Sequence, residues 1–349
     1  MRGDNYKAWL IDIDSTVARL RCSKDLVSLL EFAILAPSSH NSQPWSFSIK
    51  KNELIIAIDQ RRVLRVGDPD NIFANVSLGC TLITMLIVLD YAEIPFEYQI
   101  DTEKEQISLK LKFETYKADS NATSKKGHLI FEIPKRVTNR SIFDSTFLIP
   151  KNFKTLIHEQ FRKYNIRSNL ELFDDSNSVS FLGTFAIQTG IESMKSSSFR
   201  SELASHVKSN FTRSRVGMPA FGMEIPSLPS LLAPFFVRFF NMASLERRKD
   251  EAKLKSTQNF GLLWSKKDSF ASYIYAGMAY QLIALLSARL SLTCPVIGSL
   301  TISPDSASTV SKHLNIQGNS LLVFRLGKPT TDVPHSPRLT VLDVVTDQL

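Results

Sequence analysis

The chain has 349 residues, 43% of them hydrophobic and 22% charged, so it can bury a large core and is neither disordered nor fibrous. Its 42 lysine and arginine residues against 34 aspartate and glutamate residues give a net charge of +8. The basic residues are scattered, without a basic block interleaved with aromatics, which argues against nucleic-acid binding and favours a mildly basic surface.

Cysteine and histidine spacing gives no sign of a metal site. Cys22, Cys80 and Cys294 are far apart, and the six histidines are equally dispersed, so we expect buried thiols in a reducing compartment and no bound metal. Aspartates interrupt the N-terminal segment where a secretion signal needs an apolar run, so we predict a cytoplasmic protein.

In chain order, the first part reads as a helix, a hairpin, a long apolar helix and a second hairpin. Leucines at helical spacing predict a helix over residues 23–36, which Pro37 ends. Alternating apolar residues predict strand pairs at 45–49 with 54–58 and at 96–100 with 107–113. The apolar stretches 73–92 and 271–290 contain several polar residues, which favours buried helices over membrane spans.

Residues 115–128 lose the apolar periodicity and are typical of a surface connection. We therefore divide the chain into a first lobe, residues 1–128, and a second lobe, residues 129–349. In the second lobe the pattern predicts helices at 150–164, 178–207 and 270–290, and strands at 170–173, 260–264 and 321–326. The expected fold class is α+β.

Residues 212–245 combine four prolines with many large apolar residues, ending in the sequence LLAPFFVRFFNM. The prolines argue against one helix, and the apolar residues argue against a solvated loop. A lid over an apolar site fits this composition, an ordinary packed excursion fits it equally well, and contact with a membrane surface is a third interpretation.

The segment Ala36–Trp45, with the sequence APSSHNSQPW, lies between the predicted first helix and first strand. Its backbone and amide groups offer many donors and acceptors in a small space, as the edge of a flavin ring requires. A capped turn between a helix and a strand explains the same residue types. The ten residues, however, resemble the A-P-S-x-x-N-x-Q-P-W motif of nitroreductase-family flavoproteins at every motif position. The resemblance implies that Pro37, Ser38, Asn41 and Gln43 lie along an FMN isoalloxazine ring, with Asn41 bonded to it through its side chain.

A second motif is Arg136-x-Thr138-x-Arg140. Two guanidinium groups flanking a hydroxyl make an anion clamp, because arginine donates bidentate hydrogen bonds to phosphate oxygens. Two nearby arginines on a solvated surface are the simpler interpretation. The segment is similar to the R-x-S-x-R segment of nitroreductases, which implies contact with the FMN phosphate.

Two further segments match more loosely. Thr293–Gly298 is similar to the family loop that faces the reactive nitrogen of the flavin, which implies roles for Ile297 and Gly298. Near the C-terminus, Arg325 and Arg338 resemble the family's basic phosphate contacts.

The order of the motifs points to one branch of the family. In ordinary nitroreductases the arginine clamp precedes the A-P-S-x-x-N motif, whereas here the clamp follows it by about a hundred residues. This order resembles the Acg-like branch, in which two similar lobes of one chain imitate the family homodimer and hold one flavin between them. The resemblance implies a nitroreductase-like fold and a monomer.

Two functions follow from the resemblance. The first is an FMN-dependent oxidoreductase that passes hydride from NAD(P)H to a small-molecule acceptor, either a nitroaromatic, a quinone or a dedicated metabolite. The alternative is an FMN storage or sequestration protein whose lid, residues 212–245, closes the site. No catalytic acid, base or nucleophile is expected from the protein, since the flavin carries the chemistry.

Overall fold

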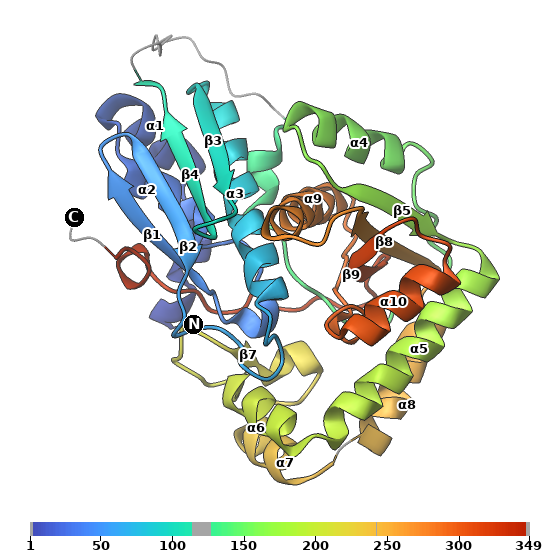
Figure 1. Cartoon of the computed structure of the whole chain (residues 1–349). Coiled ribbons are helices and arrows are strands. Elements are labelled where there is room, and N and C mark those ends of the chain that lie inside the picture. The colour runs from blue at the N-terminus through green and yellow to red at the C-terminus, as the bar shows by residue number, and fades with distance from the viewer. Residues whose placement is uncertain (1–2, 114–126, 242, 347–349) are drawn as a thin grey trace.

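The computed structural model describes residues 3–113, 127–241 and 243–346, and it has the mixed α+β composition predicted. The predicted connection at 115–128 falls almost entirely outside the described residues, so the lobe boundary stays a prediction. Figure 1 shows two separate sheets, one from each part of the chain, with two long helices between them.

The first part of the chain forms a four-stranded antiparallel sheet in the order β1-β2-β4-β3. Both predicted hairpins are present, as the strand bounds show: β1(Trp45–Lys50), β2(Glu53–Ile58), β3(Phe96–Asp101) and β4(Gln106–Leu111). The predicted helix over 23–36 is shorter, α2(Leu26–Ala33), because α1(Ile13–Ser23) precedes it and Lys24 between them takes a left-handed backbone with φ 53°. The Asp25 carboxylate then caps α2 by accepting from the Val27 amide.

The second part forms an antiparallel sheet, β5-β8-β9, with helices around it. The element bounds are α4(Phe153–Lys163), β5(Asn169–Phe173), α5(Ser176–Lys195), α6(Ser197–His206), β8(Asn259–Ser265), α9(Phe270–Arg289), α10(Pro304–His313) and β9(Asn319–Leu326). The single helix predicted over 178–207 was wrong. Ser196 adopts an extended backbone, and its hydroxyl caps α6 by accepting from the Phe199 amide, so the helix breaks there.

Helices α3(Ile72–Ala92) and α9 pack against each other at the centre of the molecule (Figure 1). Both are long and apolar enough to cross a membrane by length and composition, but 94% of the apolar window of α3 and 83% of that of α9 is buried inside the protein. Asp68 opens α3, because its carboxylate accepts from the amides of Phe73 and Ala74. These two helices carry much of the hydrophobic core.

The C-terminal tail returns to the first sheet. The Phe47 amide donates to the Val344 carbonyl over 2.8 Å, and the Thr346 amide donates to the Phe47 carbonyl over 2.9 Å. Residues 344–346 thus run parallel to β1 at Phe47, although they follow the last strand of the other sheet. This path brings basic residues near the C-terminus to the N-terminal part of the chain.

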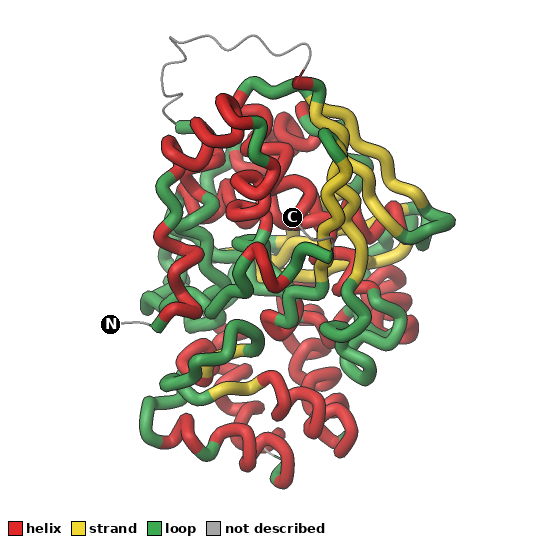
Figure 2. Tube along the Cα trace, turned by 90° about the vertical axis from the view of Figure 1, so that its left-hand side faces the viewer, coloured by secondary structure: helices red, strands yellow, loops and turns green. Residues whose placement is uncertain are grey.

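The segment 212–245 is ordered into short elements rather than one helix, namely β7(Met218–Pro219), which pairs with β6(Val207–Lys208), then η5(Ala220–Met223), η6(Pro229–Leu231), α7(Ala233–Phe239) and the start of α8(Ala243–Lys255). Its small residues pack against α6 in a separate small core. This region lies at one end of the molecule, at the bottom of Figures 1 and 2.

Candidate functional site

The segment Ala36–Trp45 is a tight loop between α2 and β1. His40, Asn41 and Gln43 all have left-handed backbones, with φ values of 49°, 52° and 52°. Such values are uncommon outside glycine and cluster at functional sites, since surrounding contacts must hold them. The Ser38 hydroxyl supplies one such contact by accepting from the Gln43 amide over 2.9 Å.

The side chains of Asn41 and Gln43 form hydrogen bonds to two segments that are distant in sequence, residues 215–217 and residues 337–339. Asn41 Nδ2 donates to the carbonyls of Gly217 and Pro337 over 3.0 and 2.9 Å. Gln43 Nε2 donates to the Arg215 carbonyl over 2.7 Å, and Gln43 Oε1 accepts from the Leu339 amide over 2.9 Å. Both side chains are therefore occupied by protein partners that the sequence did not suggest.

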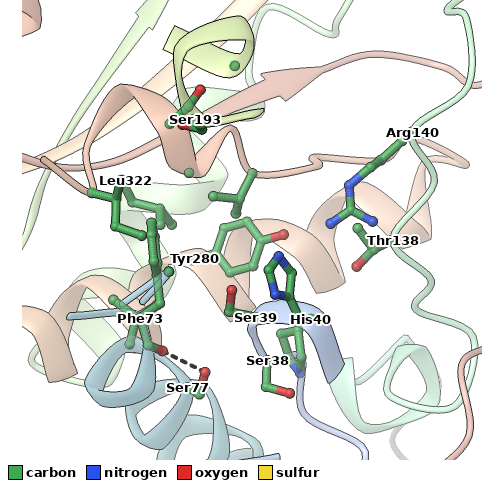
Figure 3. A pocket seen from close by; sticks show the side chains of 18 of the residues that line it. Ser38, Ser39, His40, Phe73, Ser77, Thr138, Arg140, Ser193, Tyr280 and Leu322 are labelled. Atoms are coloured by element: carbon green, nitrogen blue, oxygen red, sulfur yellow. Dashed lines mark hydrogen bonds between the residues drawn. The ribbon is translucent and has the colours of Figure 1, made fainter. Parts of the chain in front are cut away.

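The arginine clamp lies beside this loop. Arg136 donates to the Leu35 carbonyl over 3.1 Å and to the Thr138 hydroxyl over 3.4 Å. Arg338, brought in by the C-terminal tail, donates to Asn41 Oδ1, and its guanidinium carbon lies 4.7 Å from the centre of the Trp9 ring. The side chain of Arg140 points into a cavity next to the loop (Figure 3). The clamp therefore has three guanidinium groups, one of them from a remote part of the chain.

These guanidinium groups carry uncompensated charge. Arg136 and Arg338 are only 4% and 5% exposed, yet within the described part of the chain neither they nor Arg140 forms an ion pair with a carboxylate. Burial lowers the pKa of Arg338 well below its usual value, and the neighbouring Arg136 charge lowers it further. The Nε atoms of Arg136 and Arg338 are buried without a hydrogen-bond partner in the described structure. Such a cluster favours an anionic ligand.

Two cavities meet at this cluster. One has a volume of about 350 Å³ and is lined by the loop, by α3, α5 and α9, and by Val296, Gly298 and Ser299. The second, of about 270 Å³, shares Pro37, Ser38, His40, Thr138 and Arg140 with the first, and Arg136 and Arg338 line it as well. Figure 3 shows His40, Tyr280, Thr138 and Arg140 on one side of the first cavity, with Phe73 and Leu322 across from them. The two cavities therefore adjoin at Thr138 and Arg140, and the first has more apolar lining residues than the second.

His40 and Tyr280 are site residues that the sequence did not single out. His40 Nδ1 is buried without a described partner, and burial, helped by the charges of His206 and Arg140, lowers the pKa of His40 to about 3. His40 is therefore neutral at physiological pH and offers a hydrogen bond to a ligand. Its position inside the loop motif was the available signal. Tyr280, whose hydroxyl donates to the Cys294 carbonyl over 2.9 Å, had none beyond its place in an apolar helix.

The remaining predicted residues fall in different places. Gly298 lines the larger cavity, whereas Ile297 and Arg325 line a third, smaller cavity of about 180 Å³ that also reaches Arg140. Arg325 donates to the Thr257 hydroxyl over 2.7 Å and to the Lys253 carbonyl over 3.0 Å, so its donors already bind the protein. Gln43 is fully buried and lines none of these three cavities.

The fold and the site together define a mixed α+β protein with a cationic cavity next to the loop between α2 and β1. No protein-family model matches the sequence, and no curated protein matches it significantly. Among solved structures, the chain is similar to the FMN-dependent nitroreductase NfnB from Mycobacterium smegmatis in complex with NADPH. That likeness has a TM-score of 0.42 at 12% identity and covers 62% of this chain and 96% of the other.

Two further solved structures are similar. One is the FMN and NADPH-dependent nitroreductase NfnB from sphigopyxis sp. strain HMH, with a TM-score of 0.39 at 12% identity, covering 63% of this chain and 98% of the other. The second is the nitroreductase-like family protein from Bacillus cereus, with a TM-score of 0.35 at 11% identity, covering 66% and 95%. At TM-scores of this size these likenesses assign no function to this chain.

Proposed function

We propose that the chain binds one FMN, with its phosphate on Arg136, Thr138, Arg140 and Arg338 and its ring in the 350 Å³ cavity. The observation that carries this proposal is the group of three arginines, two of them buried, that have no carboxylate partner in the described structure. A phosphate monoester with a charge of about −2 would offset these charges and accept their hydrogen bonds.

The larger cavity fits the flavin ring in size and chemistry. Ligand pockets of about 300–1,000 Å³ are typical, with mostly apolar walls and a few polar groups. Phe73, Val76, Tyr280 and Val296 provide apolar surface here, and the neutral His40 ring provides an unpartnered nitrogen. A planar, mostly apolar ring with a polar edge satisfies both features.

We further propose that the protein is an NAD(P)H-dependent oxidoreductase of the nitroreductase type and of its Acg-like branch, with two lobes of one chain imitating the family homodimer. FMN held there would supply the chemistry of hydride transfer from a nicotinamide to a small acceptor. The protein neutralises the phosphate, orients the ring and keeps water from its buried edge. The acceptor we propose is a nitroaromatic, a quinone or a dedicated metabolite, in a monomeric cytoplasmic protein.

The lid is proposed in a narrower form than the full segment 212–245. Met218, Gly222 and Met223 line the 270 Å³ cavity that contains Arg136 and Arg338. The Asn41 and Gln43 side chains donate hydrogen bonds to the backbone carbonyls of residues 217 and 215. The phenylalanines that follow are exposed at the surface rather than over the cavity. We therefore assign the covering role to residues 214–223 alone.

The test is the visible absorption spectrum of the purified protein reconstituted with FMN, recorded without oxygen before and after NADPH and then NADH. Bleaching of the flavin band is the expected result. Bound flavin that stays oxidised with both nucleotides would favour storage over the oxidoreductase. A protein that binds no FMN would overturn the proposal.

A further inference from the structure

An exposed apolar surface lies at the end of the molecule formed by α6 and α7. Its members are large apolar side chains from one short stretch of sequence, and we call them the apolar patch: Leu228, Leu231, Leu232, Phe235, Phe236, Phe239 and Phe240. Leu228 is 75% exposed and Phe239 is 61% exposed. Phe235 and Phe236 contact each other and connect the other two rings, so the four phenylalanines form one continuous cluster.

Helix α7 buries its small side chains and exposes its large apolar ones, which is the opposite of the usual arrangement on the surface of a soluble protein. In α7 the small residues Ala233 and Val237, four positions apart, face inward and pack with Ala204, Val207 and Ala220. The phenylalanines face outward. A soluble helix normally buries its largest apolar side chains, and contiguous exposed apolar surface marks a contact site. The fold therefore uses the small residues of α7 for packing and leaves the large ones for a partner.

We propose that this patch docks the protein on the surface of an anionic lipid bilayer, with the phenylalanines and leucines inserted among the acyl chains near the headgroups. Short amphipathic elements rich in Phe and Leu and flanked by basic residues bind in this manner. The docking does not depend on whether FMN binds, because none of the patch residues lines the cavities of the candidate site.

Charge favours a lipid surface over a second copy of this chain. Between Glu224 and Glu246 the sequence contains a single charged residue, Arg238, which is exposed beside the patch, with its guanidinium carbon 5.5 Å from the centre of the Phe239 ring. Two copies joined through the patch would bring like charges together on chains that each carry +8. An anionic bilayer attracts Arg238 instead, by roughly 1 kcal/mol for a basic residue near the surface.

The experiment is sedimentation of the full-length protein with vesicles of phosphatidylcholine alone or mixed with phosphatidylglycerol. We expect binding to the anionic vesicles and a drop of about tenfold in the partition coefficient for the double variant F235S/F239S, which loses two inserted side chains. Arg238→Glu should weaken binding to the anionic vesicles but not to the neutral ones. The matched control is L148S/L342S, which changes two leucines that are 80% and 78% exposed elsewhere, and its binding should equal that of the natural chain.

Three results would overturn the proposal: no binding to either vesicle, equal binding by F235S/F239S, or a dimer in sedimentation velocity that F235S/F239S dissociates while vesicles stay free. The last would assign the patch to a second copy. Circular dichroism melting of each variant checks folding, and little change is expected because all substituted side chains are exposed.

Discussion

Gly79 in α3 and Gly277 in α9 face each other with no room for a methyl group at either position. A Cβ at Gly79 would lie 2.0 Å from the Ile274 carbonyl oxygen, and a Cβ at Gly277 would lie 1.9 Å from the Val76 carbonyl oxygen. This close approach lets the Cys80 thiol donate to the Gly277 carbonyl over 3.2 Å. Both helices also contribute residues to the lining of the larger cavity, Phe73, Val76, Ser77 and Cys80 from α3 and Tyr280 from α9.

We expect Gly277→Ala to destabilise the protein by about 1–3 kcal/mol or more, because a methyl group against backbone forces the two helices apart. The measurement is thermal unfolding followed by circular dichroism. The matched control is Gly183→Ala in α5, where the nearest atom to a new Cβ is 3.7 Å away. That control should keep or raise the melting temperature, since alanine is the better helix former. Equal effects of the two substitutions would contradict the packing argument.

For the anion site, we expect Arg136→Ala and Arg140→Ala each to weaken FMN binding by about 1.5–3 kcal/mol, the usual loss for a charge-assisted hydrogen bond. Quenching of FMN fluorescence on titration with protein measures the Kd. Arg61→Ala is the control, because its guanidinium is mostly exposed, pairs with Asp59 and lines none of the three cavities at the site. If both site variants bind FMN as tightly as the natural chain, these arginines do not hold the phosphate.

A large side chain at Gly190 would fill part of the larger cavity, so substitutions there test whether the reactants enter this cavity. This glycine lines the cavity, and no heavy atom lies within 4 Å of a Cβ built on it. We expect Gly190→Phe to lower kcat/KM for reduction of a quinone acceptor by about tenfold or more, because loss of about 1.4 kcal/mol of transition-state binding gives that factor. Gly190→Ala, which adds one methyl group to open space, should keep the activity. Full activity in the Phe variant would place the reaction elsewhere.

A pH effect is expected at Asp90, which links α3 to the second part of the chain. Its Oδ2 atom lies 2.7 Å from both His128 Nε2 and Lys163 Nζ. Burial alone would raise the pKa of Asp90, but these hydrogen bonds outweigh it and hold the pKa at about 2. An aspartate in the unfolded chain titrates near about 3.9, so the ionised form stabilises the fold above that pH, and the stabilisation is lost as pH falls toward 2.

We therefore expect Asp90→Asn to cost about 1–2 kcal/mol of unfolding free energy at pH 7, after allowance for solvent screening, and much less at pH 2.5. Urea unfolding at both pH values measures the difference. Glu103→Gln, which changes an exposed carboxylate in a turn, should show no such pH-dependent loss. An equal cost at both pH values would mean that Asp90 acts through shape rather than charge.

Local patterns predicted a large share of the fold. The hairpins of β1 with β2 and of β3 with β4 follow from the alternation of apolar residues, and α3 and α9 follow from long apolar runs whose polar residues favour buried helices. The break at Ser196 was missed because apolar periodicity continues on both sides of it, and only the cap on the Phe199 amide marks the boundary. Helices α1, α8 and α10 were also missed, since α1 and α8 have polar sequences on average.

The sequence by itself determined the loop motif, the basic residues of the clamp and the α+β class, because these depend on residue types close together along the chain. Only the tertiary structure decided that Arg338 meets Asn41 across 297 positions and that the arginines have no carboxylate partner among the described residues. It also decided that the phenylalanines of α7 face outward while Ala233 and Val237 face inward. Each of these depends on which distant segments pack together, and packing is set by the mutual fit of whole elements, which no local pattern contains.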